Sequence, residues 1–146
     1  MGDATHAALV KAAGRWLRGT KRCDVAFEEQ PHAYLPEVPD AIGWTSNPLG
    51  RTSCLVVECK TSVADCRADM RKRHAKNGET MGDRRWILAP RGVLSVDHLP
   101  PLHGLLELRG TKVYVVKHAP PRDKTWARLE AEVTWLRVEL CSRGRR

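Results

Sequence analysis

Two segments with the residue pattern of β-strands carry charged residues at their ends. Asp40 opens the segment 40–44, and Glu58 and Lys60 lie at the end of the apolar segment 53–60. Side chains alternate along a strand, so Glu58 and Lys60 are expected on one face. A hairpin around the intervening Asn-Pro turn places Asp40 beside Glu58 at the same end of the sheet. The spacing therefore predicts that two carboxylates and one ammonium group converge.

This group of residues has the composition of a phosphate-hydrolysing metal site. Two carboxylates suit a hard divalent cation, above all Mg²⁺ (or Mn²⁺), which keeps several of its waters. Such an ion polarises a phosphoryl oxygen and lowers the pKa of a bound water, and a nearby Lys can position that water. Asp40 and Glu58 are the expected ligands and Lys60 the expected catalytic lysine. The alternative is a solvated strand end at Glu58 and Lys60, with Asp40 as a turn residue after Pro39.

Apolar periodicity and turn residues predict the elements that position these groups. Helices are expected at 5–18, from 62 to about 76, and at 124–141. Strands are expected at 23–27, 40–44, 53–60, 85–89 and 112–116, with loops at 30–39 and 93–106. The strand 53–60 is apolar on both faces, which is typical of a central strand. The order predicts an α/β fold with a mixed central sheet flanked by helices and a long C-terminal helix.

Composition excludes several classes of protein. The 146 residues are expected to form one domain, 1–146, with a core at about 5–118 and a C-terminal helix at about 124–141. A hydrophobic content of 42% and five Trp exclude a disordered chain. No apolar run reaches the ~18 residues of a membrane span and no signal peptide is evident, so a non-membrane, cytoplasmic protein is expected. Five Cys without a CxxC pair indicate structural thiols.

The net charge of +8 favours a polyanionic partner. Eight Lys and Arg residues, against three acidic ones, fall within the segment 67–91, directly after the Glu-x-Lys strand. This segment is expected to hold a nucleic-acid backbone, and the alternative is a solvated helix face. The candidate nucleic-acid-binding residues are Arg67, Arg71, Lys72, Arg73, Lys76, Arg84 and Arg85.

The Pro-Asp pair at 39–40 and the segment 55–60 (Leu-Val-Val-Glu-Cys-Lys) resemble the motif of the PD-(D/E)XK nuclease superfamily. Thr61, Ser62 and Asp65 resemble a narrower branch of small stand-alone phage and bacterial proteins, including MmcB-like DNA-repair proteins. The stretch 81–94 also resembles the next strand of that branch, and the likeness covers roughly residues 20–118. The resemblance implies a restriction-endonuclease-like fold.

The resemblance also implies roles for individual residues. Asp40 and Glu58 are implied as metal ligands, with the backbone carbonyl of Cys59 as a third, and Lys60 is implied as the catalytic lysine. The first helix lacks the carboxylate that many members carry, and Glu37 is a candidate to replace it. This departure leaves open a one-metal mechanism or a loss of activity.

Several neighbouring residues have two interpretations. Thr61 and Ser62 are expected either to bind a phosphate or to cap the following helix. Asp65 is expected either to orient Lys60 or a metal-bound water, or to act as a cap. Asp69 is interpreted as half of a surface pair with Arg73.

The C-terminal helix carries an apolar seam at heptad spacing. Either the seam packs on the chain's own sheet, or it forms a homodimer, which would provide the two active sites needed to cut both strands of a duplex. The seam consists of Trp126, Leu129, Val133, Leu136 and Leu140.

The sequence thus predicts a Mg²⁺-dependent nuclease that acts on DNA in repair, recombination or processing, in the cytoplasm of a bacterium or a phage-infected host. One alternative is a nuclease-fold module that binds nucleic acid or a protein without turnover. The other is an inhibitor or adaptor of a host or phage complex.

Overall fold

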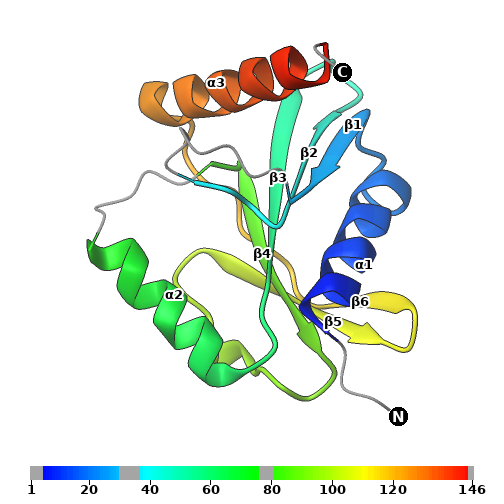
Figure 1. Cartoon of the computed structure of the whole chain (residues 1–146), viewed down its shortest axis with the longest axis vertical. Helices are drawn as coiled ribbons and strands as arrows, with labels where there is room; N and C mark the ends of the chain where they lie inside the picture. The colour runs from blue at the N-terminus through cyan, green and yellow to red at the C-terminus, as the bar shows by residue number, and fades with distance from the viewer. Residues whose placement is uncertain (1–4, 30–36, 76–80, 145–146) are drawn as a thin grey trace.

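The computed structural model describes residues 5–29, 37–75 and 81–144. A six-stranded sheet with the order β1-β2-β3-β4-β5-β6 forms the centre (Figure 1). The strands are β1 (Val25–Glu28), β2 (Ala41–Ser46), β3 (Thr52–Cys59), β4 (Arg84–Pro90), β5 (His103–Arg109) and β6 (Lys112–Lys117). The helices are α1 (His6–Gly19), α2 (Val63–Ala75), the 3-10 turn η1 (Val96–His98) and α3 (Trp126–Arg143).

The sheet is mixed, as predicted. β1, β2 and β3 form an antiparallel meander, β3-β4 and β4-β5 are parallel, and β6 returns antiparallel to β5. The two parallel steps require crossovers, which α2 and the segment containing η1 supply. Helices therefore lie on both sides of one sheet, and the expected α/β class is confirmed.

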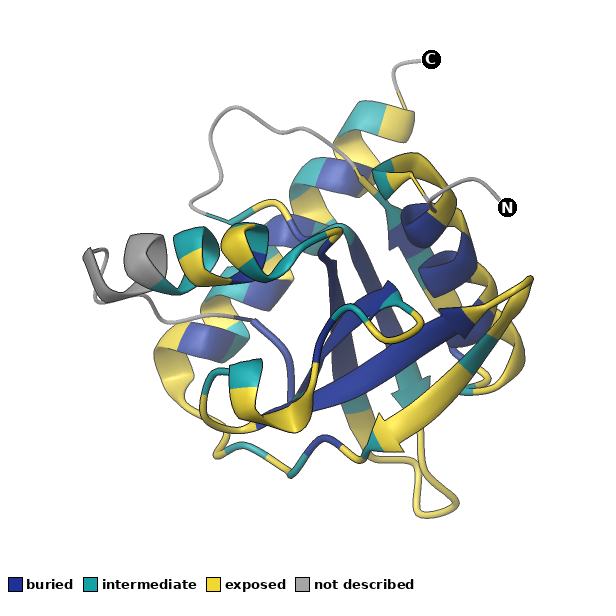
Figure 2. Ribbon diagram, turned by 90° about the horizontal axis from the view of Figure 1, so that it is seen from below, coloured by how far each residue is buried: buried dark blue, intermediate teal, exposed yellow. Residues whose placement is uncertain are grey.

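Side-chain alternation along β3 divides the core into two faces. Leu55, Val57 and Cys59 pack in the cluster beneath α1, which also holds Trp16. The opposite residues of β3 face the other side, where Val56 packs with Trp135 of α3. A third cluster joins α2 to β4 and β5. Every β3 residue from 54 to 59 is buried, as expected for a central strand (Figure 2).

The strand β5 lies in the segment that was predicted to be a loop. Pro100, Pro101 and Gly104 suggested an interruption, but the prolines precede the strand and Gly104 lies inside it. An added Cβ at Gly104 would lie 2.5 Å from Trp86 Cδ1 and 2.6 Å from the Ala119 nitrogen. The glycine thus permits a close approach of neighbouring chain segments, which explains how a residue unfavourable in strands occurs in a buried one.

The C-terminal helix exists as predicted, but its apolar seam packs only in part, with Leu136 against the core cluster that holds Val56 and Trp135. The buried residues of α3 are Arg128, Glu132, Trp135 and Glu139. Trp126 is 81% exposed, and Val133 and Leu140 are 65% and 60% exposed. These three residues of the seam therefore do not pack on the chain's own sheet.

Polar contacts attach α3 to the sheet. Arg128 donates a 3.1 Å hydrogen bond to Asp83, whose other carboxylate oxygen accepts a 2.7 Å bond from the Cys54 N–H. Glu132 accepts a 2.9 Å bond from the Gly82 N–H, and burial raises the pKa of the Glu132 carboxyl. These buried polar partners fix which side of the helix turns inward, because an unsatisfied buried charge is costly.

Two further findings concern the chain as a whole. Among residues 5–29, 37–75 and 81–144, no helix is long and apolar enough to cross a membrane. All five Cys are free thiols, and four of them are buried. Four of the five therefore agree with the expectation of structural thiols, whereas Cys141 is exposed.

Replacing Gly104 by Ala tests the close approach at β5. We expect Gly104→Ala to lower the free energy of unfolding by about 3 kcal/mol, because backbone on one side and Trp86 on the other leave no space for a methyl group. Gly19→Ala is the matched control, since an added Cβ there meets nothing within 4 Å. Urea unfolding followed by Trp fluorescence measures both, and equal stability of the two variants would contradict the packing role.

Candidate metal and phosphate site

The hairpin of β2 and β3 brings the predicted carboxylates to one end of the sheet. Ala41 pairs with Val57, so the preceding residue, Asp40, meets Glu58. Lys60 follows the strand directly, and its N–H donates a 2.9 Å hydrogen bond to the Leu88 carbonyl. The strand register therefore agrees with the expected position of Asp40 beside Glu58 along the strand pair.

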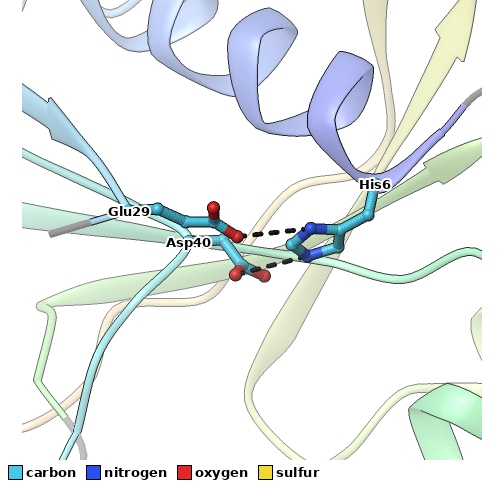
Figure 3. A group of neighbouring side chains, drawn as sticks. All are labelled: His6, Glu29 and Asp40. Carbon is cyan, nitrogen blue, oxygen red and sulfur yellow. Dashed lines mark ion pairs between the residues drawn. The ribbon is translucent and has the colours of Figure 1, made fainter. Parts of the chain in front are cut away.

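Asp40 is anchored to β3 through its carboxylate. Oδ2 accepts a 2.7 Å hydrogen bond from the Cys59 N–H, and Oδ1 lies 3.4 Å from His6 Nε2. His6 Nδ1 lies 3.2 Å from Glu29 Oε1, so the imidazole bridges two carboxylates (Figure 3). One ligand atom from each of His6, Glu29 and Asp40 lies within 4.8 Å of the others, a spacing compatible with a bound cation.

Glu58 has a different electrostatic environment. Its Oε1 lies 3.2 Å from Arg85 Nη2, and Arg85 Nη1 lies 2.6 Å from Glu37 Oε1. The Arg85 side chain is completely buried, and Nη1 also donates to the Met81 carbonyl at 2.7 Å. Burial alone would lower the pKa of Arg85, but the Glu37 and Glu58 carboxylates outweigh it and the pKa is raised. A permanent positive charge therefore adjoins Glu58.

Lys60 shares this environment. Its Nζ lies 3.6 Å from Asp69 Oδ2 on α2, and its side chain is only 11% exposed. Asp69 also contributes to the raised pKa of Arg85, which places both cations near the same helix. Asp69 thus pairs with Lys60, and the side chain of its predicted partner, Arg73, lies outside the described part of the chain. The prediction that Asp65 orients Lys60 finds no such contact among the described residues.

The residues after Lys60 cap α2. Ser62 Oγ accepts a 3.0 Å hydrogen bond from the Asp65 N–H, and Asp65 Oδ2 accepts a 3.4 Å bond from the Thr61 N–H. This reciprocal pattern satisfies donors at the start of the helix. The capping interpretation of Ser62 and Asp65 is confirmed, and Thr61 is exposed beside it.

The pKa of the Cys59 thiol is affected by the charged residues of the site. Its side chain is buried, and burial, followed by the nearby Asp40 and Glu58 carboxylates, raises the pKa of the thiol. Glu29 acts in the same direction and Lys60 opposes it. The thiol therefore stays protonated and packs as a small apolar side chain in the core.

The predicted basic surface is smaller than expected. Arg85 is fully buried in its ion pairs, so it is wrong as a phosphate contact. Arg84 Nη1 donates to the Ala119 carbonyl and its side chain is half-buried, so it too serves the fold. Arg67 is exposed on α2. The side chains of Arg71, Lys72 and Arg73, and all of Lys76, lie outside the described part of the chain.

Two residues of the site, His6 and Glu29, were not predicted, and Arg85 was predicted for a different role. Tertiary packing brings His6 and Glu29 to Asp40, and neither residue belongs to a sequence motif that would predict this contact. Arg85 did leave a signal, since an arginine within an otherwise apolar strand needs a buried counter-charge. Glu37, a candidate replacement carboxylate, instead pairs with Arg85 and accepts a hydrogen bond from the Met81 N–H at 2.9 Å.

Comparison with known proteins adds information on the fold. No family model matches the chain, and no curated protein matches it. A solved structure, "SPO1766 protein of unknown function from Silicibacter pomeroyi", is similar with a TM-score of 0.65 and 24% sequence identity. The match covers 98% of this chain and 89% of that one. The likeness shows that the α/β architecture is shared.

Removal of Arg85 tests its role between the carboxylates. We expect Arg85→Met to cost about 3–5 kcal/mol of unfolding free energy, because it removes a buried charge that pairs with two carboxylates of little exposure. The triple variant Arg85→Met, Glu37→Gln and Glu58→Gln should recover much of the loss. Arg67→Met is the exposed control. Chemical unfolding measures all three, and an unchanged midpoint for Arg85→Met would contradict the role.

Proposed function

We propose that this protein is a metal-dependent nuclease that hydrolyses DNA phosphodiester bonds, in repair, recombination or processing. The observation that supports the proposal is the register of the β2-β3 hairpin: Ala41 pairs with Val57, so Asp40 and Glu58 are neighbours along the strand pair, and Lys60 follows two residues after Glu58. The resemblance of the motif residues to the PD-(D/E)XK superfamily supports it. Exposed cations such as Arg67 would bind the backbone.

The donor atoms fit a divalent ion such as Mg²⁺ or Mn²⁺. Asp40 and Glu58 offer carboxylate oxygens, and Cys59, directly after Glu58, offers its backbone carbonyl. His6 and Glu29 offer a second set around Asp40. Asp40 is common to both sets. When bound, the ion supplies Lewis-acid activation of the phosphate and of an attacking water.

The chain's own residues then position the reaction. The Cys59 N–H holds the Asp40 carboxylate at the end of the sheet. Asp69 holds the Lys60 ammonium beside the strand, where it can orient water or stabilise charge on the phosphate. Thr61 follows Lys60 at the surface and provides a hydroxyl near an incoming phosphate.

A second candidate function is a nucleic-acid-binding module without turnover. The ion pair between Glu58 and buried Arg85 favours it, because a metal ion at Glu58 has to compete with a fixed guanidinium. Such a module would bind DNA with strong dependence on salt and would not cleave it.

Cleavage of a fluorescent oligonucleotide and of a supercoiled plasmid in Mg²⁺ or Mn²⁺ tests the proposal. We expect Asp40→Asn and Lys60→Met to lower the rate at least about 100-fold, because each removes a group that acts on the transition state. Asp24→Asn and Lys112→Met are matched controls, since both residues are exposed and lie outside the site. Equal cleavage by all variants would mean a contaminating nuclease. Salt-dependent binding without cleavage would support the second function.

Calorimetric titration with Mn²⁺ distinguishes the two donor sets. Asp40→Asn should abolish binding in either case. His6→Ala is expected to weaken binding if the ion lies between α1 and β2, and Glu58→Gln if it lies over β3. Circular dichroism checks that each variant is folded, and Asp24→Asn again serves as the control. Binding that survives Asp40→Asn would exclude both sets.

A further inference from the structure

An apolar stripe runs along the outer side of α3. Trp126, Val133 and Leu140 are each more than half exposed and lie seven residues apart. Leu129 and Leu136 lie between them along the same seam and are half-buried. The buried side of α3 carries Trp135 and the polar contacts to the sheet. Leu136 packs partly against the core, and the other residues of the seam lie at or near the surface. An exposed apolar stripe of this kind marks an interaction surface.

We propose that the seam binds the same seam of a second copy of this chain, as an antiparallel pair of α3 helices. Apolar residues at heptad positions a and d can pack against the same positions of an identical helix. A surface that binds an unrelated partner does not need this spacing. With Trp126, Val133 and Leu140 at a, an antiparallel pair places Val133 against Leu136 of the second copy. Leu129 then meets Leu140 of the second copy, and each layer occurs twice about the two-fold axis.

The charges beside the seam select the antiparallel direction. Glu130 and Arg137 occupy the e positions, both are exposed, and neither makes an ion pair with another described residue. In the antiparallel register, Glu130 faces Arg137 of the second copy, and the symmetric pair forms as well. Opposite charges therefore meet at both edges of the contact.

A parallel pair lacks this match. Parallel helices bring e positions opposite g positions, and the g positions of α3 are Glu132 and Glu139. Both glutamates are buried against the chain's own sheet, where Glu132 accepts the Gly82 N–H and Glu139 pairs with Arg143. They are not available to a second copy.

The size of the contact sets the expected affinity. The 18 residues of α3 span about 27 Å at 1.5 Å per residue. One helix pair of this length gives a small interface, so we expect a dimer with a Kd on the order of micromolar. The inference does not depend on the proposed nuclease activity, since it concerns only association.

Sedimentation of the full chain between about 1 and 300 µM tests the association in the range expected for a small interface. We expect a monomer–dimer equilibrium, and the double variant Val133→Glu, Leu140→Glu should remain monomeric throughout. Leu49→Glu is the matched control, because Leu49 is apolar and 81% exposed but lies in the β2-β3 turn. A monomeric wild type at every concentration, or equal dissociation by Leu49→Glu, would overturn the proposal.

Charge reversal tests the direction of the helices. Glu130→Arg or Arg137→Glu alone should weaken the dimer roughly tenfold, since each creates two like-charge contacts at the rim. The double variant with both reversals should restore the wild-type affinity. Both positions are exposed, so the variants are expected to fold. If the single reversals have no effect, or the double variant fails to recover, the antiparallel register is wrong.

Discussion

The arrangement of the candidate site depends on a guanidinium group that has no access to solvent. Arg85 lies near the start of β4, and its two nitrogens reach Glu37 in the segment before β2 and Glu58 at the end of β3. Three separate stretches of chain are therefore tied together by one side chain. The charges must be paired because the burial of any one alone would be costly. The same pairing fixes the end of β3 on which Lys60 and the cap of α2 are built.

The site divides into two electrostatic halves around β3. On the side of α1, Asp40 accepts a hydrogen bond from a backbone N–H, and its carboxylate lies beside two other possible metal ligands, His6 and Glu29. On the side of α2, Glu58 faces a fixed cation and Lys60 faces Asp69. The first half has the composition of a cation-binding site. The second half is a set of ion pairs, in which Asp69 contacts Lys60 and Arg85 contacts Glu58. A working site would need both halves, and a binding module would need only the second.

Much of this arrangement followed from local patterns. The register of a short hairpin is set by its turn, so the proximity of Asp40 and Glu58 was predictable from the spacing alone. The cap of α2 was predictable because the hydrogen bond between Ser62 and Asp65 joins residues that are only three apart in sequence. The contacts of His6 with Asp40 and of Arg85 with Glu37 were not, since they join segments far apart in sequence.

Two of the errors arose where tertiary packing overrode a local signal. Gly104 was interpreted as a break, but the neighbouring Trp86 makes a small residue necessary inside β5. The seam of α3 was weighed as core because apolar spacing does not show which side of a helix meets the sheet. Buried partners for Arg128 and Glu132 decided the orientation instead.

The edge strand β6 limits how copies of this chain can meet. It carries Tyr114, Val115 and Val116 at the surface, and an open strand edge of this kind is a template for another strand. Lys112 and Lys117 bound the strand. If two copies joined edge to edge in antiparallel fashion, each lysine would lie against a lysine, and repulsion would oppose a continuous sheet. Lysines at both ends of β6 thus act as a safeguard against aggregation through the sheet, while the helical surface stays open to association.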